Sequence, residues 1–319
     1  MNEHFIKNIE IKNFKCFDNF KAERFGRVNL IGGKNNVGKT AFMEAVYVNV
    51  HSDNIEHLII SLYAIVYIRN YLEYVTEDIP TVSKALDEVK KYNTKSNIRS
   101  VTFKSESKKA KKKYYFFDEE RKKGDFSNDS DDYDDIENIK FIDNYGFTNF
   151  QLNNVYTSVQ LKNKEQELNE YIQEFDSTIK FFKIINDKPQ CQVENEEYRS
   201  LSEFGDGLKD YISIICSLYA CENGYLFIDE IDNGIHYTQL DKLWEIILTI
   251  SKQQNVQVFA TTHSKECIES YARVAKRLED EEIAFIELCK REEEIKAFVY
   301  PYDWFIDEIE QEHEVRGCL

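Results

Sequence analysis

The chain has 319 residues, of which 42% are hydrophobic and 31% charged, and its formal net charge is −17. We expect a globular protein with a sizeable core, organised as a single domain over residues 1–319. The acidic excess disfavours a general nucleic-acid binder, and no apolar run is long enough to span a bilayer. An N-terminus without a signal-peptide pattern favours a cytoplasmic location. The cysteines are scattered and odd in number, so we expect reduced thiols without a metal role.

The first fifty residues predict two strands, a buried strand and a helix. Residues 5–17 alternate between apolar and polar side chains, which predicts a strand and a turn, and residues 20–25 could form its hairpin partner. The run Val28-Asn29-Leu30-Ile31 predicts a buried strand, and residues 40–50 predict a helix with one apolar side. The first two strands would make an N-terminal β-layer beside a nucleotide base.

A glycine-rich loop joins that buried strand to that helix. It reads Gly33-Lys34-Asn35-Asn36-Val37-Gly38-Lys39-Thr40, the Gly-x-x-x-x-Gly-Lys-Thr pattern of phosphate-binding loops. Glycines let several N–H groups point at one anion, and the helix dipole favours a phosphate there. Lys39 can reach the β- and γ-phosphates, and Thr40 can bind Mg²⁺. We predict that the nucleotide contacts Gly33, Asn35, Asn36, Val37, Gly38, Lys39, Thr40 and Ala41.

Residues 51–200 are predicted to form an inserted lobe within the domain. It would begin with helices at 55–75 and 81–92, followed by strands at 97–103 and 113–118. A lysine cluster between these strands could contact nucleic acid or an acidic partner, or could be a solvated hairpin tip. The cluster comprises Lys104, Lys108, Lys109, Lys111, Lys112 and Lys113.

The rest of the lobe is predicted from weaker patterns. Residues 125–137 are rich in Asp, Ser and Asn, which predicts an acidic loop that could neutralise the lysine cluster. Residues 139–159 predict short strands and turns, residues 164–175 a polar helix, and residues 179–185 a strand.

From Leu201 a strict alternation of helices and strands predicts a parallel sheet. Gly205-Asp206-Gly207 precedes the first of these helices, so it predicts a second anion-binding turn with Asp206 as the helix N-cap. An ordinary cap and turn is the alternative. Beyond residue 270 the pattern predicts a strand pair at 283–288 and 295–300, and then a short helix.

Two later strands end in residues suited to catalysis. Tyr225-Leu226-Phe227-Ile228 is followed by Asp229 and Glu230, an apolar strand that delivers two carboxylates to the sheet edge where ligands bind. Asp229 would help to hold Mg²⁺, and Glu230 would polarise or deprotonate the attacking water. Residues 256–261 predict the next strand, which leads to His263. His263 could contact the γ-phosphate and report hydrolysis, or it could cap the helix predicted at 265–276.

This order of loop, glycine turn, acidic strand end and histidine resembles the ATP-binding-cassette (ABC-type) ATPases of the SMC, RecF and OLD group. It is most like the AAA/OLD-like ATPase subunits of prokaryotic antiphage defence systems such as Septu and PARIS. The resemblance covers residues 5–40 and about 201–270. It implies an α/β ABC-type P-loop ATPase head with a mixed sheet, an N-terminal antiparallel β-layer and an inserted helical and β-hairpin lobe.

The resemblance also implies ATP and Mg²⁺ as cofactors and assigns roles to individual residues. Lys39, Glu230 and His263 would be catalytic, Thr40 and Asp229 would bind the metal, and the glycine turn would be the signature motif. The signature residues are Gly205 and Gly207.

This chain departs from the family pattern in several places. The usual signature serine is replaced by Gly205 unless Ser202 substitutes, and Ile235-His236 stands where Leu-Asp is common. The lid glutamine has only candidates, Gln151 and Gln160. About fifty residues follow residue 270, too few for the Toprim nuclease domain of OLD nucleases, so we expect no nuclease in this chain.

The leading expectation is an ATP-binding and hydrolysing switch subunit in antiphage defence. It would form a homodimer or higher homo-oligomer around ATP and control a separately encoded effector protein, a nuclease or toxin, away from membranes. One alternative is a RecF-like DNA-binding repair ATPase, which the acidic charge disfavours. The other is a weakly hydrolysing ATP-binding scaffold, suggested by the missing signature serine.

Overall fold

The computed structural model describes residues 4–51, 138–194, 196–292, 294–311 and 313, and the backbone of three strands at 100–107, 113–118 and 123–128. The helices predicted at 55–75 and 81–92 lie outside these residues. Lys108, Lys109, Lys111 and Lys112 of the lysine cluster lie outside them too.

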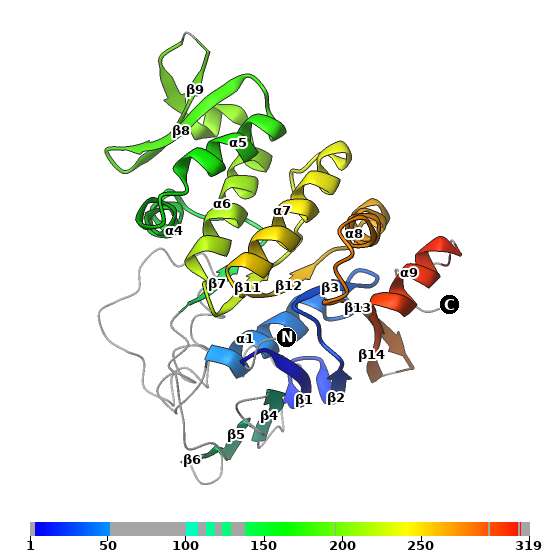
Figure 1. The fold of residues 1–319 in the computed structure, drawn as a ribbon. Helices are drawn as coiled ribbons and strands as arrows, with labels where there is room; N and C mark the ends of the chain where they lie inside the picture. Colours follow the sequence, from blue (N-terminus) through cyan, green and yellow to red (C-terminus); the bar gives the residue numbers. More distant parts are fainter. Residues whose placement is uncertain are drawn as a thin grey trace.

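A mixed central sheet organises the described part of the chain (Figure 1). Its six strands lie in the order β14-β13-β3-β12-β11-β7. Their bounds are β3 Val28–Gly32, β7 Ile139–Ile142, β11 Tyr225–Ile228, β12 Gln257–Thr261, β13 Ile283–Arg291 and β14 Glu294–Pro301. All neighbouring pairs are parallel except β13 with β14. The carboxyl ends of β3, β12, β11 and β7 therefore meet at one edge.

The two faces of the central sheet carry separate hydrophobic cores. On one face, Tyr225 and Phe227 of β11 pack with helix α1 (Lys39–His51) and the N-terminal strands. On the other face, Leu226 and Ile228 pack with helices α6 (Asp206–Ala220), α7 (Leu240–Gln253) and α8 (Lys265–Arg277). Figure 1 shows these three helices on the side of the sheet away from α1. Alternation along each strand thus sends successive side chains into different cores.

The N-terminal β-layer is a second sheet, in the order β2-β1-β4-β5-β6. Its strands are β1 Ile6–Phe14, β2 Phe17–Glu23, β4 Ser100–Ser107, β5 Lys113–Asp118 and β6 Lys123–Asn128, and all pairs are antiparallel. The predicted hairpin and the two strands around the lysine cluster are confirmed. The acidic loop predicted from residue 125 is wrong at its start, because residues 125–128 pair with β5.

A lobe of two helices and a small sheet leads into α6. It contains α4 (Asn149–Leu161), α5 (Glu165–Phe175) and the strands β8 (Ile179–Ile185), β9 (Lys188–Val193) and β10 (Tyr198–Ser200). The short strands predicted beyond β7 are wrong, because residues 149–161 form a helix. Thr148 and Gln151 make a capping box at its start, and one side is buried. The buried residues are Leu152, Val155, Tyr156 and Val159.

Residues 51–200, predicted as one inserted lobe, are divided between three places where they are described. Strands β4–β6 extend the N-terminal sheet, β7 is an edge strand of the central sheet, and only α4 to β10 form the lobe. Strand pairing across long sequence separations decides this division, and periodicity within one segment carries no information about it.

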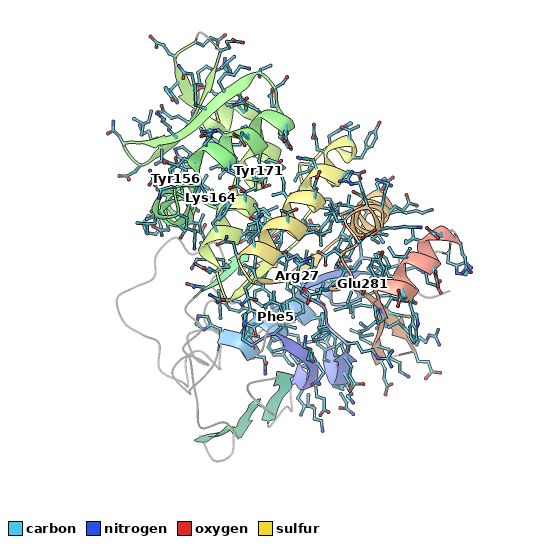
Figure 2. All side chains as sticks on the ribbon, in the orientation of Figure 1. Phe5, Arg27, Tyr156, Lys164, Tyr171 and Glu281 are labelled. Atoms are coloured by element: carbon cyan, nitrogen blue, oxygen red, sulfur yellow. The ribbon has the colours of Figure 1, made fainter. Side chains whose placement is uncertain are left out.

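The sheet edge opposite the carboxyl ends is tied by a buried ion pair around Arg27, which Figure 2 labels. Arg27 is 2% exposed and forms ion pairs with Asp280 and, at 3.2 Å, with Glu282. Its guanidinium also donates to Ser251 Oγ and, at 3.2 Å, to the Leu248 carbonyl. Removing Arg27 would leave the buried Asp280 carboxylate without its cation, so this cluster is structural. The predicted C-terminal strand pair is confirmed as β13 and β14, followed by α9 (Tyr302–Glu310).

Candidate functional site

The glycine-rich loop after β3 has no room for other residues at its two glycines. Gly33 and Gly38 have φ angles of 142° and 91°, which side-chain-bearing residues rarely adopt. A Cβ on Gly33 would lie 2.5 Å from the Leu288 carbonyl oxygen, and one on Gly38 would lie 2.8 Å from Cys16 Sγ. The loop is therefore enclosed by β13 on one side and by the turn between β1 and β2 on the other.

Lys39 folds back over this loop. Its Nζ donates to the carbonyl oxygens of Gly33 and Lys34, at 2.9 and 3.0 Å. Burial lowers the pKa of Lys39, while nearby carboxylates, chiefly Glu230 and Asp229, act to raise it. The ammonium group thus lies over the loop, held by two carbonyl acceptors that an incoming phosphate could replace.

Thr40 and Asp229 meet across the sheet edge, as a shared metal site requires. The Thr40 hydroxyl donates to both Asp229 carboxylate oxygens, at 3.2 and 3.0 Å. Burial raises the pKa of Asp229, the hydroxyls of Thr261 and Thr40 oppose the shift, and the Glu44 and Glu230 carboxylates add to it. Hydroxyl and carboxylate oxygens are ligands that Mg²⁺ prefers.

A cation at this place would draw most of its ligands from elsewhere. Across the described ranges, no three His, Cys, Asp or Glu side chains converge in a metal-binding cluster. Mg²⁺ at nucleotide sites commonly takes one or two protein ligands and completes its shell with phosphates and water. The pair Thr40 and Asp229 fits that pattern.

Glu230 has a left-handed backbone, with a φ angle of 53°. Its N–H donates to the Thr261 hydroxyl at 2.8 Å, which supports a conformation uncommon for glutamate. His263 follows β12 at the same sheet edge, and its side chain is exposed. The alternative that His263 caps helix α8 is wrong, because Ser264 is the N-cap and accepts from Cys267 N at 3.1 Å.

The two glycines before α6 serve different purposes. Gly205 is the N-cap residue, with a φ angle of 90°, and an added Cβ would meet nothing within 4 Å. A Cβ on Gly207 would lie 1.9 Å from the Gly234 carbonyl oxygen, so this glycine permits a close backbone contact. Asp206, predicted as the N-cap, is the first helical residue instead, because the backbone turns one residue earlier.

The structure places the lesser candidates away from the sheet edge or in local turns. Ser202 lies on a short 3₁₀ helix, residues 201–204, and its hydroxyl is 2.8 Å from that of Ser200. Gln151 caps α4, accepting from Thr148 N at 2.8 Å, and Gln160 donates to Glu165 at 3.3 Å. Gln151 is therefore engaged at the start of α4, and Gln160 links α4 to α5.

Sequence reasoning missed Asp143, which follows β7 at the same edge. Asp229 N donates to the Ile142 carbonyl at 2.8 Å, so Asp143 and Asp229 leave adjacent parallel strands. Burial raises the pKa of Asp143, with a smaller contribution from Asp229. The signal in the sequence was an acidic residue directly after a short apolar run.

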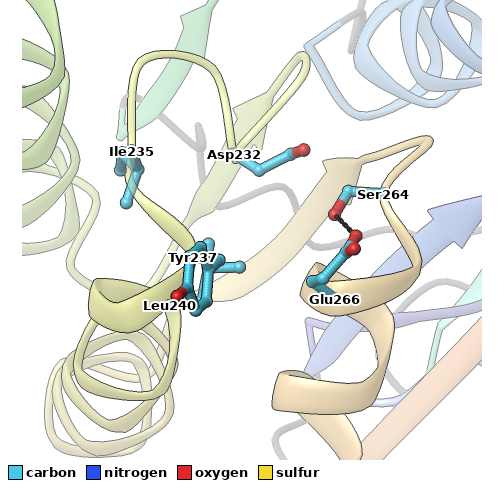
Figure 3. A pocket seen from close by; sticks show the side chains of 6 residues that line it. All are labelled: Asp232, Ile235, Tyr237, Leu240, Ser264 and Glu266. Carbon is cyan, nitrogen blue, oxygen red and sulfur yellow. Dashed lines mark hydrogen bonds between the residues drawn. The ribbon is translucent and has the colours of Figure 1, made fainter.

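A pocket of about 390 Å³ opens beside these loops (Figure 3). It lies between the segment after β11 and the start of α8, and the Ser264 hydroxyl contacts Glu266 at 3.0 Å on its rim. Its lining residues are Asp232, Ile235, Tyr237, Leu240, Ser264 and Glu266. His236, next to Ile235, caps the short 3₁₀ helix at residues 237–239.

Comparison with known proteins agrees with this geometry. Residues 66–269 match the family described as "AAA domain, putative AbiEii toxin, Type IV TA system". That range includes Asp229, Glu230 and His263 but not the glycine-rich loop. An "ATP/GTP phosphatase" of Helicobacter pylori is 27% identical over 334 residues, which cover 85% of this chain and 88% of that protein.

Solved structures show the same fold at low sequence identity. The SMC head domain from Thermotoga maritima superposes with a TM-score of 0.52 at 12% identity, over 93% of this chain and 98% of that one. An SMC head bound to the C-winged helix domain of ScpA gives a TM-score of 0.50 at 11% identity, over 93% and 98%.

Within the described ranges, no helix has the length and apolar character needed to cross a membrane. The matched family model spans more than half of the sequence, and the structure has the mixed sheet and antiparallel β-layer of an SMC head. The chain therefore belongs to this family of AAA domains and has the fold of an SMC-type ATPase head.

Proposed function

We propose that this protein is an ATP-binding and ATP-hydrolysing switch subunit. The contact between Thr40 and Asp229 carries the proposal, because it joins the glycine-rich loop to the acidic strand end at 3.0–3.2 Å. A metal ion held by both would lie beside Lys39 and the start of α1. The matched family and the phosphatase from Helicobacter pylori support the same class of reaction.

The chain's residues would act mainly by positioning groups and neutralising charge. Lys39 would exchange its carbonyl contacts for the β- and γ-phosphates, and the loop N–H groups would bind the same oxygens. Mg²⁺, when bound at Thr40 and Asp229, supplies further charge neutralisation. Glu230 would accept a proton from the attacking water, and His263 would contact the γ-phosphate.

We further propose that two copies close around ATP and control a separately encoded effector, in antiphage defence. The glycine-rich loop covers one side of the phosphates, and Gly205 at the start of α6 has open space above it. A two-fold dimer would bring each turn to the partner's nucleotide. The SMC head solved with a domain of ScpA shows that this fold can dock a second protein.

Glu230→Gln tests this proposal because it removes the base and keeps the size of the side chain. We expect ATP binding to persist while turnover falls on the order of a hundredfold, and native mass measurement to show an ATP-dependent dimer, with the neighbouring gene product bound. Equal turnover in wild type and variant would remove Glu230 from the mechanism. A monomer in every state, with no partner, would contradict the switch.

The second candidate is a weakly hydrolysing ATP-binding scaffold. Gly205 offers no side-chain donor, and the Ser202 hydroxyl is already within 2.8 Å of Ser200 Oγ. ATP-dependent assembly with the effector, together with wild-type turnover as slow as that of Glu230→Gln, would identify the scaffold.

A further inference from the structure

We propose that Thr261 and Thr262 are positioning residues for hydrolysis. Thr261 would fix the two carboxylates after β11, and Thr262 would fix the segment that carries His263. The proposal rests on the ATPase function proposed above, but the contacts that it invokes exist without nucleotide.

Thr261 connects the strand end directly to the acidic pair. It is the last residue of β12, fully buried, and it follows Ala260, which pairs with Ile228 of β11. Its hydroxyl donates to Asp229 Oδ1 at 2.5 Å and accepts from Glu230 N at 2.8 Å. One hydroxyl can do both, whereas an isosteric valine can do neither.

Loss of the Thr261 hydroxyl would affect both acids at once. Asp229 would lose the hydroxyl donor that holds its Oδ1. Glu230 would lose the acceptor that holds its left-handed backbone, and its N–H would be left without a partner. Thr261 therefore sets the position of the metal ligand and that of the base.

Thr262 makes the equivalent connection one residue later. It is fully buried, and its hydroxyl donates to Asp232 Oδ1 at 2.6 Å and accepts from Ser264 N at 3.0 Å. Its backbone N–H donates to the Ile31 carbonyl at 3.0 Å, at the end of the strand that leads to the glycine-rich loop. His263 lies between these anchored residues.

The turn that Thr262 holds has two further contacts. Asn233 Nδ2 donates to the Asn144 carbonyl at 2.9 Å, in the connection from β7 to the lobe. Gly234 lies against Gly207 at the start of α6. A displacement of the His263 segment would thus act through Asp232 on a turn that contacts both the connection from β7 to the lobe and the start of α6.

Valine and serine variants separate this role from simple packing. Valine keeps the shape and removes the hydroxyl, whereas serine keeps the hydroxyl. We expect Thr261→Val and Thr262→Val to lower kcat about tenfold to a hundredfold, with Thr261→Ser and Thr262→Ser near wild type. Thr157→Val is the control, because Thr157 is exposed on α4 and bonds only to its own helix at 3.2 Å.

A double-mutant cycle tests whether Thr262 acts through His263. Thr262→Val should cost little further activity in a His263→Ala background, because the positioned group is already absent. Full additivity of the two changes, or failure of serine to restore kcat, would overturn the assignment of Thr262.

Amide hydrogen exchange, measured without nucleotide, tests the Thr261 contact independently of ATPase activity. Thr261→Val should raise the exchange rate of the Glu230 amide, and Thr261→Ser should leave it slow. An unchanged Glu230 amide in Thr261→Val would overturn the role of Thr261. If exchange responds as expected while wild type hydrolyses no ATP, the positioning contact stands and only the proposed function fails.

Discussion

The chain places glycines ahead of two helices, α1 and α6, and the two turns are enclosed very differently. Added Cβ atoms at Gly33 and Gly38 would fall within 3 Å of other parts of the chain, whereas one at Gly205 would meet nothing within 4 Å. The phosphate loop is thus shaped by this chain's own contacts, whereas Gly205 and Asp206 are exposed at the start of α6 and only Gly207 is covered, by Gly234.

The charges around the two helix starts differ as well. Helix α1 begins with Lys39, a cation that suits a phosphate. Helix α6 carries Asp206 in its first turn and Asp210 one turn later, with Asp143 close to Asp210. An anion at the start of α6 would be repelled unless it arrived with its own cations, as a Mg²⁺-nucleotide held by a partner's lysine would.

The largest expected effect is on the free energy of unfolding, when the glycine of each turn is replaced by alanine. Gly33→Ala should lower the free energy of unfolding by roughly 3–5 kcal/mol, since strain adds to a clash with the Leu288 backbone. Gly205→Ala should cost only about 1–2 kcal/mol, from backbone strain alone. Urea unfolding measures both free energies, and equal losses would contradict the claim that the two turns are enclosed to different degrees.

Nucleotide affinity should respond next most strongly, and only to the half-buried Lys39. Lys39→Ala should weaken ATP binding about tenfold to a hundredfold, because a charged donor worth roughly 1.5–3 kcal/mol is lost. Lys34→Ala is the matched control: this exposed residue offers only its backbone carbonyl to Lys39. Titration calorimetry with an ATP analogue measures both, and similar affinities would contradict the role of Lys39.

The smallest expected effect is a pH dependence at the start of α6. Burial raises the pKa of Asp210 to about 6, with Lys209 opposing the rise and Asp206 and Asp143 adding to it. Because the folded-state pKa lies above the unfolded value, this residue's contribution to stability is present at pH 4 and is lost as the pH rises through 6.

Asp210→Asn should remove that loss. The variant should match wild type at pH 4 and exceed its free energy of unfolding by on the order of 1 kcal/mol at pH 8, a value discounted for partial exposure. Asp187→Asn, in the exposed turn between β8 and β9, is the matched control. If the free energies of unfolding of Asp210→Asn and wild type differed by the same amount at all pH values, ionisation of Asp210 could not be the cause.

The sequence was most informative where a local pattern and a local structure coincide. The glycine-rich loop lies between its predicted strand and helix, and the acidic strand end and His263 follow the strands predicted for them. Helix α4 was missed because Asn153, Asn154 and Thr157 have low helix propensity, although the Thr148 capping box was readable.

Contacts between strands could not be predicted in the same way. The roles inferred for Thr261 and Thr262, and the place of Asp143 beside Asp229, depend on β12 and β7 being the two neighbours of β11. Periodicity shows that a strand is buried and is silent about its neighbours, so these residues looked like ordinary polar strand ends. The assigned site residues themselves stay predictions until nucleotide binding is measured.

The burial of α1 affects the rate of amide exchange and the rate at which ATP binds. Residues 41–50 are all buried between the central sheet and the N-terminal sheet. Unfolding this helix would therefore require the two sheets to move apart and expose the core between them. Its amides should exchange with solvent only on global unfolding. ATP therefore meets a loop that is already built, and no ordering step slows its association. The lifetime of the bound state would then depend on what closes over the nucleotide from the side of α6.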